Sequence, residues 1–347
     1  MNLADKIKFL SQSCAVSGAE TGIAEYLKDV LSKKLGEAYI DNMGNVIACK
    51  KTLTGCGSVM LEAHMDEIGL MVNKIYDDGF LGIVPVGGID KRILPGNVVN
   101  VHSKGKNYKG VIGAKPPHVM SADEYNEVVD FGSLFVDCGF SYDYAVENIS
   151  VGSTVTFDSS FIKLGEKLLS SKSMDDRASV AVLLDIAEKI SKTDLDYDLY
   201  ICICVQEEVG LHGAPVAAYS VNPDFAVAID VTHAKTPDES KLEISCGSGI
   251  ALCKGPNIHP GLVSSFEKFL QYKKISYEVE IEPGNTGTDA WAIQTAREGI
   301  PVMLLSLPLK YMHTPIETLS IDDCKLLSDT LTKFLKSFKR TEDILCY

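Results

Sequence analysis

Apolar residues near the start of the chain recur at regular intervals. The clearest set is Leu27, Val30, Leu31 and Leu35. Spacings of three and four positions are typical of the buried face of an amphipathic helix. The pattern is interrupted at residues 16–20, where Ser17 and Gly18 interpose a turn. Residues 4–36 are therefore predicted to form two helices.

Further along, short apolar runs alternate with segments of helical periodicity. Runs that are short, rich in β-branched residues and bounded by charge predict buried strands. Strands are predicted at residues 38–49, 58–63, 199–205, 224–229 and 301–307. Helices are predicted at residues 178–190, 289–298 and 321–338. This alternation predicts an α/β fold.

Residues 69–162 have a different pattern. Short apolar runs are separated by turn sequences such as Asp77-Asp78-Gly79 and Leu94-Pro95-Gly96, and no long amphipathic helix stands out. Many short strands with regular turns are typical of a small β barrel or sandwich. We therefore expect an inserted β domain at residues 69–162, with residues 1–68 and 163–347 forming one α/β domain around it.

Composition narrows the classes of function. The chain has 347 residues and a net charge of −14, which argues against a nucleic-acid partner. No apolar run approaches the roughly 20 residues that span a bilayer, so no membrane partner is expected. The ten cysteines form no CxxC pair and several lie in apolar runs, which favours reduced thiols and a cytoplasmic location.

Ionisable residues gather where predicted strands end or helices begin. The predicted strand at residues 199–205 leads into Glu207 and Glu208, and two adjacent acids are costly to bury without a cation. Ligand sites of open α/β sheets lie beyond the carboxyl ends of strands. The candidate metal ligands in chain order are His64, Asp175, Glu208, Asp230 and His313.

This set of side chains suits a particular metal chemistry. Imidazole combined with carboxylate suits zinc, cobalt or manganese, whereas calcium takes only oxygen ligands. Five ligands exceed the three of a single hydrolytic zinc and suit two ions that share a carboxylate. Asp66 follows His64 by two positions and faces the same side in extended chain, where it can hold the imidazole ring.

Simpler interpretations apply to several of these residues. The adjacent acids Asp175 and Asp176 could serve only to cap a helix. Residues 284–288 lack the lysine of a phosphate-binding loop and are interpreted as a turn. Neither Ser17 nor Ser173 lies in a nucleophile-elbow sequence. The remaining histidines are interpreted as ordinary surface or core residues: His102, His118, His233 and His259.

Ordered motifs spread over nearly the whole chain resemble the M42 family of metallo-aminopeptidases, which includes glutamyl aminopeptidases and TET peptidases. The motifs that contain the candidate ligands lie at residues 64–69, 174–177, 205–211, 228–232 and 311–317. Further matching motifs lie at residues 17–20, 87–90, 113–118 and 287–290. So many motifs in the same order make chance agreement a poor explanation.

The resemblance implies a zinc-peptidase-like α/β sandwich with a mixed central sheet and a PDZ-like β domain at residues 69–162. It implies two divalent metal ions, with zinc expected before cobalt or manganese. Asp175 would bridge them; His64 and Asp230 would complete one site, and Glu208 and His313 the other. Glu207 would be the general base, Asp66 would support His64, and the Asp175–Asp176 peptide bond would be cis.

The same resemblance implies peptide substrates with a free α-amine and a homo-oligomer, most simply a tetrahedral dodecamer. Two positions depart from the family pattern: His212 and Lys310 stand where arginine is common. The alternatives are another metal hydrolase on this scaffold, such as a deacetylase, carboxypeptidase or deblocking peptidase, and a non-catalytic peptide-binding shell. A glycosidase would need two separated carboxylates and no metal.

Overall fold

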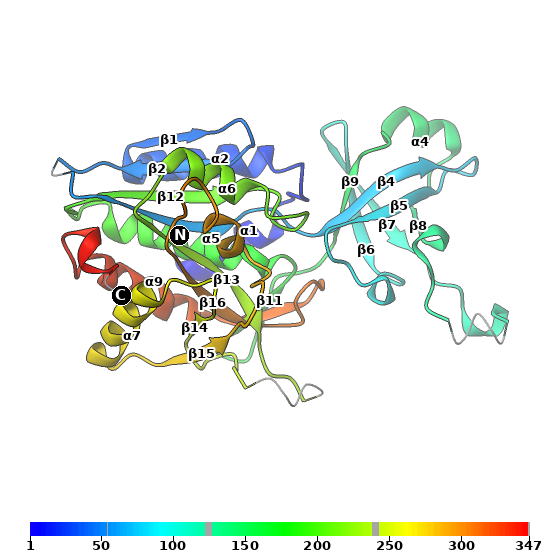
Figure 1. The fold of residues 1–347 in the computed structure, drawn as a ribbon. Helices are drawn as coiled ribbons and strands as arrows, with labels where there is room; N and C mark the ends of the chain where they lie inside the picture. The colour runs from blue at the N-terminus through cyan, green and yellow to red at the C-terminus, as the bar shows by residue number, and fades with distance from the viewer. Residues whose placement is uncertain (54, 122–126, 238–242, 346–347) are drawn as a thin grey trace.

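The computed structural model describes residues 1–53, 55–121, 127–237 and 243–345. It has a large part, in which helices pack on an extended sheet, and a smaller barrel connected to it by two chain segments (Figure 1). Each part has its own cluster of buried apolar side chains.

The large sheet is mixed. Among the described residues it has 11 strands, nine of which follow the order β1-β2-β12-β3-β13-β16-β17-β11-β10, while β14 joins β16 and β15 joins β14. Neighbours run parallel at β12–β3, β3–β13, β13–β16 and β14–β15. The strands are β1 (Glu37–Ile40), β2 (Val46–Lys50), β3 (Ser58–His64), β10 (Ile162–Leu164), β11 (Leu168–Ser171), β12 (Asp198–Cys204), β13 (Phe225–His233), β14 (Ile250–Lys254), β15 (Tyr277–Ile281), β16 (Val302–Lys310) and β17 (Glu317–Ser320).

Helices cover this sheet. The central strands β12, β13 and β16 are buried along almost their whole length, as expected for strands packed on both faces. The long helix α5 contacts β3 and β13 as well as α1 and α9, whereas α6 and α8 pack on each other and on the central strands. The helices are α1 (Leu3–Gln12), α2 (Thr21–Leu35), α5 (Met174–Ile190), α6 (Gly213–Val221), α7 (Pro260–Lys273), α8 (Asp289–Ile293) and α9 (Ile321–Leu335).

The smaller part is a closed antiparallel barrel with the strand order β4-β5-β8-β7-β6-β9. Leu70, Val72, Val99, Val101 and Val155 point into its own apolar core. Its elements are β4 (Gly69–Ile75), β5 (Leu81–Val86), β6 (Val98–Ser103), β7 (Lys106–Ile112), β8 (Phe135–Asp137), α4 (Tyr142–Asn148) and β9 (Thr154–Phe157). Short 3-10 turns lie at Lys91–Ile93, Pro117–Val119 and Phe131–Ser133 in this region and at Thr341–Asp343 near the C-terminus.

The α/β class, the two N-terminal helices and the strand that leads into Glu207 and Glu208 are confirmed, whereas the strand predicted at residues 224–229 continues past Asp230 to His233. The single strand predicted at residues 38–49 is wrong, because the carboxylate of Asp41 accepts the backbone N–H groups of Met43, Gly44 and Asn45 and so turns the chain. The helix predicted at residues 289–298 ends at Ile293. Within the described residues, no helix has the length and apolar character needed to cross a bilayer.

Candidate metal centre and active site

Glu207 and Glu208 lie just after the end of β12. Gln206 has a φ of 58°, so the extended backbone ends there and the next two side chains are no longer on opposite faces. The backbone N–H groups of Glu207 and Glu208 donate to the Asp66 carboxylate at 3.0 and 3.2 Å. One buried carboxylate therefore fixes the turn that brings both glutamates to the same site.

His64 ends β3 beside this turn and is 2% exposed. Its Nε2 lies 3.1 Å from Oδ1 of Asp175, and its Nδ1 lies 3.4 Å from Oδ1 of Asp66. Ser17 Oγ donates to the other Asp66 oxygen at 2.6 Å. The ring is thus held between a carboxylate that faces the cavity and one that lies behind it.

Asp175 lies between the two imidazoles. Its second oxygen, Oδ2, is 3.4 Å from Nε2 of His313, which in turn is 3.3 Å from Oε2 of Glu208. Asp175 and Asp176 depart from helical torsions near the start of α5, and the peptide bond between them is cis. The chain therefore kinks where Asp175 enters the site.

Glu317 was not identified from the sequence, although it lies in one of the motifs. Its carboxylate accepts the backbone N–H of His313 at 2.8 Å and that of Asp175 at 3.1 Å. His313 Nδ1 also lies 2.9 Å from the carbonyl oxygen of Gly88, and a Cβ at Gly88 would come within 3.0 Å of the same ring nitrogen. Glu317 and the Gly88 backbone together fix the orientation of these two candidate ligands.

The five candidate ligands form two groups that share Asp175. His64, Asp175 and Asp230 have ligand atoms within 4.8 Å of one another, as do Asp175, Glu208 and His313. Glu208 Oε1 is buried and has no hydrogen-bond partner among the described residues. Each group combines one imidazole with two carboxylates, a donor set that suits zinc, cobalt or manganese. The side chains therefore fit divalent metal ions.

Electrostatics favours positive charge at this site. Burial raises the pKa of Glu207 to about 10, with His64 opposing the shift and Asp230 adding to it. Burial and Asp175 raise the pKa of Asp230 well above its ordinary value. Burial alone would raise the pKa of Asp66 too, but its hydrogen bond with His64 lowers it. Several carboxylates thus lie close together with little access to water, and bound cations would stabilise their ionised form.

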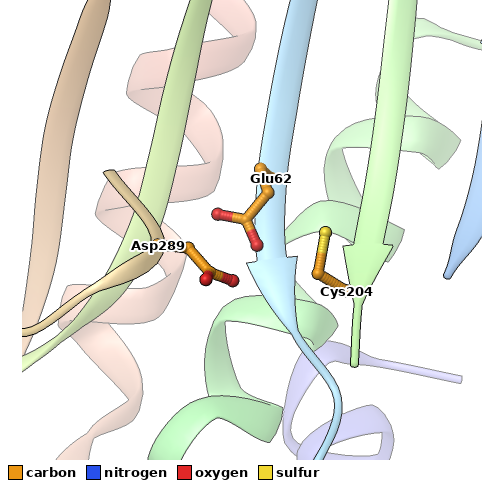
Figure 2. A group of neighbouring side chains, drawn as sticks. All are labelled: Glu62, Cys204 and Asp289. Atoms are coloured by element: carbon orange, nitrogen blue, oxygen red, sulfur yellow. The ribbon is translucent and has the colours of Figure 1, made fainter. Parts of the chain in front are cut away.

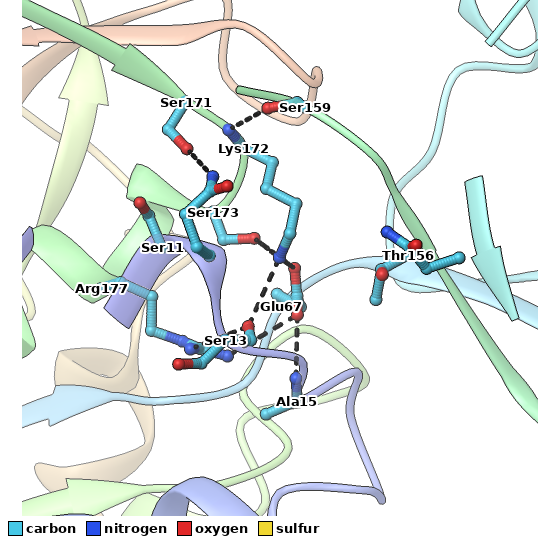
Figure 3. Close-up of polar contacts among 12 residues, drawn as sticks. Ser11, Ser13, Ala15, Glu67, Thr156, Ser159, Ser171, Lys172, Ser173 and Arg177 are labelled. Carbon is cyan, nitrogen blue, oxygen red and sulfur yellow. Dashed lines mark hydrogen bonds and ion pairs between the residues drawn. The ribbon is translucent and has the colours of Figure 1, made fainter. Parts of the chain in front are cut away.

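A buried ion pair supports the site from behind (Figure 3). Glu67 follows Asp66, and its carboxylate lies 2.5 Å from Lys172 Nζ and accepts the backbone N–H of Ala15 at 2.9 Å. Nη2 of Arg177, on α5, lies 3.8 Å from Oε1 of Glu67. These contacts join the end of β3 to the N-terminal segment and to the start of α5, so they hold the segments that carry His64 and Asp175 together.

A third group lies deeper in the fold and was also missed (Figure 2). Glu62 on β3, Cys204 at the end of β12 and Asp289 at the start of α8 have ligand atoms within 4.8 Å of one another. All three side chains are almost fully buried. Burial raises the pKa of Glu62 to about 8. The group brings residues of β3, β12 and α8 together in the interior of the fold.

The candidate ligands open into a pocket of about 260 Å³. Both ligand groups and Glu207 line it, together with side chains that the sequence did not single out, including Thr232, Glu280 and Glu282. His233, interpreted from the sequence as an ordinary residue, also lines the pocket. His212 lines a neighbouring hollow with Trp291, and Lys310 ends β16.

Comparisons with known proteins agree with this site. The family model for M42 glutamyl aminopeptidase matches residues 44–329. A lysyl aminopeptidase of Pyrococcus furiosus is 36% identical over 339 residues, which covers 95% of this chain and 96% of the relative.

Solved structures give the same result. An aminopeptidase from the archaeon Desulfurococcus kamchatkensis is 36% identical, with a TM-score of 0.90 over 97% of this chain and 95% of the other. The Pyrococcus horikoshii TET1 peptidase, which can assemble into a tetrahedron or a large octahedral shell, is 29% identical. Its TM-score is 0.87, and the match covers 97% of this chain and 100% of the other. The chain therefore belongs to the M42 glutamyl aminopeptidase family and is a peptide hydrolase.

Proposed function

We propose that this protein uses two divalent metal ions to remove the N-terminal residue from peptides. The observation that carries the proposal is the Asp175 carboxylate, whose two oxygens face the imidazoles of His64 and His313. Asp230 would complete the ligand set of one ion and Glu208 that of the other. Zinc is the expected ion, with cobalt or manganese as alternatives.

Divalent ions held by these residues would supply Lewis acidity, which would polarise the peptide carbonyl and lower the pKa of a bound water. Glu207 accepts the proton of the attacking water and passes it to the leaving amine. Glu207 suits this role because it faces the same cavity as the ligands but belongs to neither ligand group. Asp66 would hold the His64 ring, and by accepting the backbone N–H groups of Glu207 and Glu208 it would position both the base and the ligand.

The wider organisation follows the same proposal. Residues 69–162 would form an inserted domain of PDZ-like type, which the separate apolar core of the barrel supports. By analogy with the TET1 peptidase, the chain would form a homo-oligomer, a tetrahedral dodecamer, around a cavity that admits peptides. A cytoplasmic location would suit the buried thiols of Cys49, Cys202, Cys204, Cys253 and Cys324.

Aminoacyl-p-nitroanilides and their N-acetyl derivatives test the reaction. With zinc, cobalt or manganese added in turn, the protein should cleave the free-amine substrates only, and a chelator should abolish the activity reversibly. Equal turnover of leucyl and N-acetyl-leucyl substrates would show a deblocking peptidase instead. Full activity in excess chelator would contradict the metal centre.

A further inference from the structure

Glu280 is an acidic residue of the pocket that the proposed reaction does not use. It lies on β15 and is half-buried. Thr232 Oγ1 donates to one of its carboxylate oxygens, and Ser306 Oγ donates to the other at 3.4 Å. An ionised carboxylate has about four lone-pair directions, so both oxygens keep capacity for a further donor. The two hydroxyl groups orient Glu280 and leave it able to bind a ligand.

The position of Glu280 places it next to the metal centre. Thr232 follows the candidate ligand Asp230 by two positions on β13, so the two side chains lie on the same face of the strand. Ser306 pairs with Asp230 across the neighbouring strand β16. Glu280 thus lies one side chain away from Asp230, in the same pocket as the candidate ligands.

The charge of the pocket wall defines what could bind there. Six carboxylates line the pocket, and no Lys or Arg is among its described lining residues. Two divalent ions would balance four of them, namely the three carboxylates among the candidate ligands and Glu207. The negative charges of Glu280 and Glu282 would remain. Burial raises the pKa of Glu280, and Glu282 adds to the shift. A cation at this wall would stabilise both carboxylates.

We infer that Glu280 binds the ammonium or guanidinium group of a basic N-terminal residue, and that Glu282 supports it. This inference rests on the proposed function. The pocket has a volume of about 260 Å³, just below the roughly 300–1,000 Å³ of typical small-molecule sites, so it is a small site. The same wall repels an acidic side chain, so the enzyme selects against N-terminal glutamate.

Matched substrates isolate the contribution of the side-chain charge. Lysyl-p-nitroanilide should be cleaved with a kcat/KM about 10- to 100-fold above that of norleucyl-p-nitroanilide, which has a similar chain without the ammonium group. Glutamyl-p-nitroanilide should be the poorest of the three. Glu280→Gln should bring the lysyl-to-norleucyl ratio close to one, because it removes the negative charge and keeps the size of the side chain.

Glu278→Gln is the control, since Glu278 lies on the same strand, is exposed and does not line the pocket. It should leave the ratio unchanged, and both variants should keep the metal content and melting temperature of the parent protein. Equal kcat/KM for lysyl and norleucyl substrates in the parent protein would overturn the inference. So would an equal loss on both substrates in Glu280→Gln, which would show that Glu280 binds the α-amine. If no free-amine substrate were cleaved, the proposed function itself would fail.

Discussion

Replacing Glu207 and Glu208 one at a time separates proton transfer from metal binding. Glu207→Gln keeps the size of the side chain and its hydrogen-bonding capacity but cannot accept a proton. The contacts that position this segment use backbone N–H groups, which the substitution leaves in place. The variant should therefore keep both ions and bind substrate, but turn over slowly.

The expected loss in each variant follows from the surroundings of the glutamate that is replaced. Glu207 Oε2 lies 3.9 Å from His64 Nε2 but belongs to neither ligand group, so the loss should be that of a general base. This loss is about 10²- to 10⁴-fold in kcat, or about 3–5 kcal/mol at 1.36 kcal/mol per tenfold. Glu208 is a member of a ligand group, with one oxygen 3.3 Å from His313 Nε2. Glu208→Gln should weaken the binding of one ion.

The assay pairs kcat on a leucyl substrate with metal content by mass spectrometry. Glu207→Gln should contain two ions per chain at every metal concentration used. Glu208→Gln should contain fewer, and excess metal should partly restore its activity. If Glu207→Gln loses an ion while Glu208→Gln stays fully loaded, the two roles are reversed and the reasoning is wrong.

Three further predictions concern stability and assembly. Lys172→Met should leave Glu67 buried without its closest cation and cost about 3–5 kcal/mol of unfolding free energy in urea titrations. The control Lys34→Met removes a partly exposed ion pair with Glu188 and should cost less than about 1 kcal/mol. Burial alone would raise the pKa of Glu67, but Lys172 lowers it, so this stabilisation should be present above pH ~4.3 and be lost as the pH falls further. Phe334→Ala should cost about 3–5 kcal/mol because Phe334 is 1% exposed, while Tyr272→Ala, at 79% exposed, should change stability by less than about 0.5 kcal/mol. Light scattering at micromolar concentration should detect a dodecamer, and a fully active monomer with metal bound would contradict the proposed assembly.

The sequence identified the features of the site that depend on short-range patterns. The apolar run that ends before Glu207 and Glu208 located these two glutamates, because the carboxyl end of a strand lies at the edge of the sheet. The same pattern located Asp230, although β13 continues past it to His233. The spacing of His64 and Asp66 likewise predicted a carboxylate beside the imidazole, and the two groups lie 3.4 Å apart. These inferences needed only the position where a strand ends and the rule that residues two apart in a strand face the same side.

The parts that were missed depend on contacts between distant segments. Glu280 enters the pocket because β15 pairs with β14 and β14 with β16, and neither β14 nor β15 was predicted. Glu62 lies close to Asp289, more than half of the chain away in sequence, and no local pattern reports such proximity (Figure 2). The hairpin at residues 37–50 was missed because its turn is made by the side chain of Asp41, which apolar periodicity does not report.

Anomalous diffraction from crystals grown with zinc tests the central claim most directly. The account predicts two peaks about 3.5–4 Å apart, each within about 2.0–2.2 Å of its ligands, with Asp175 bound to both. His64 and Asp230 should complete one coordination sphere, and Glu208 and His313 the other. A single peak, or two peaks of which neither contacts Asp175, would contradict it.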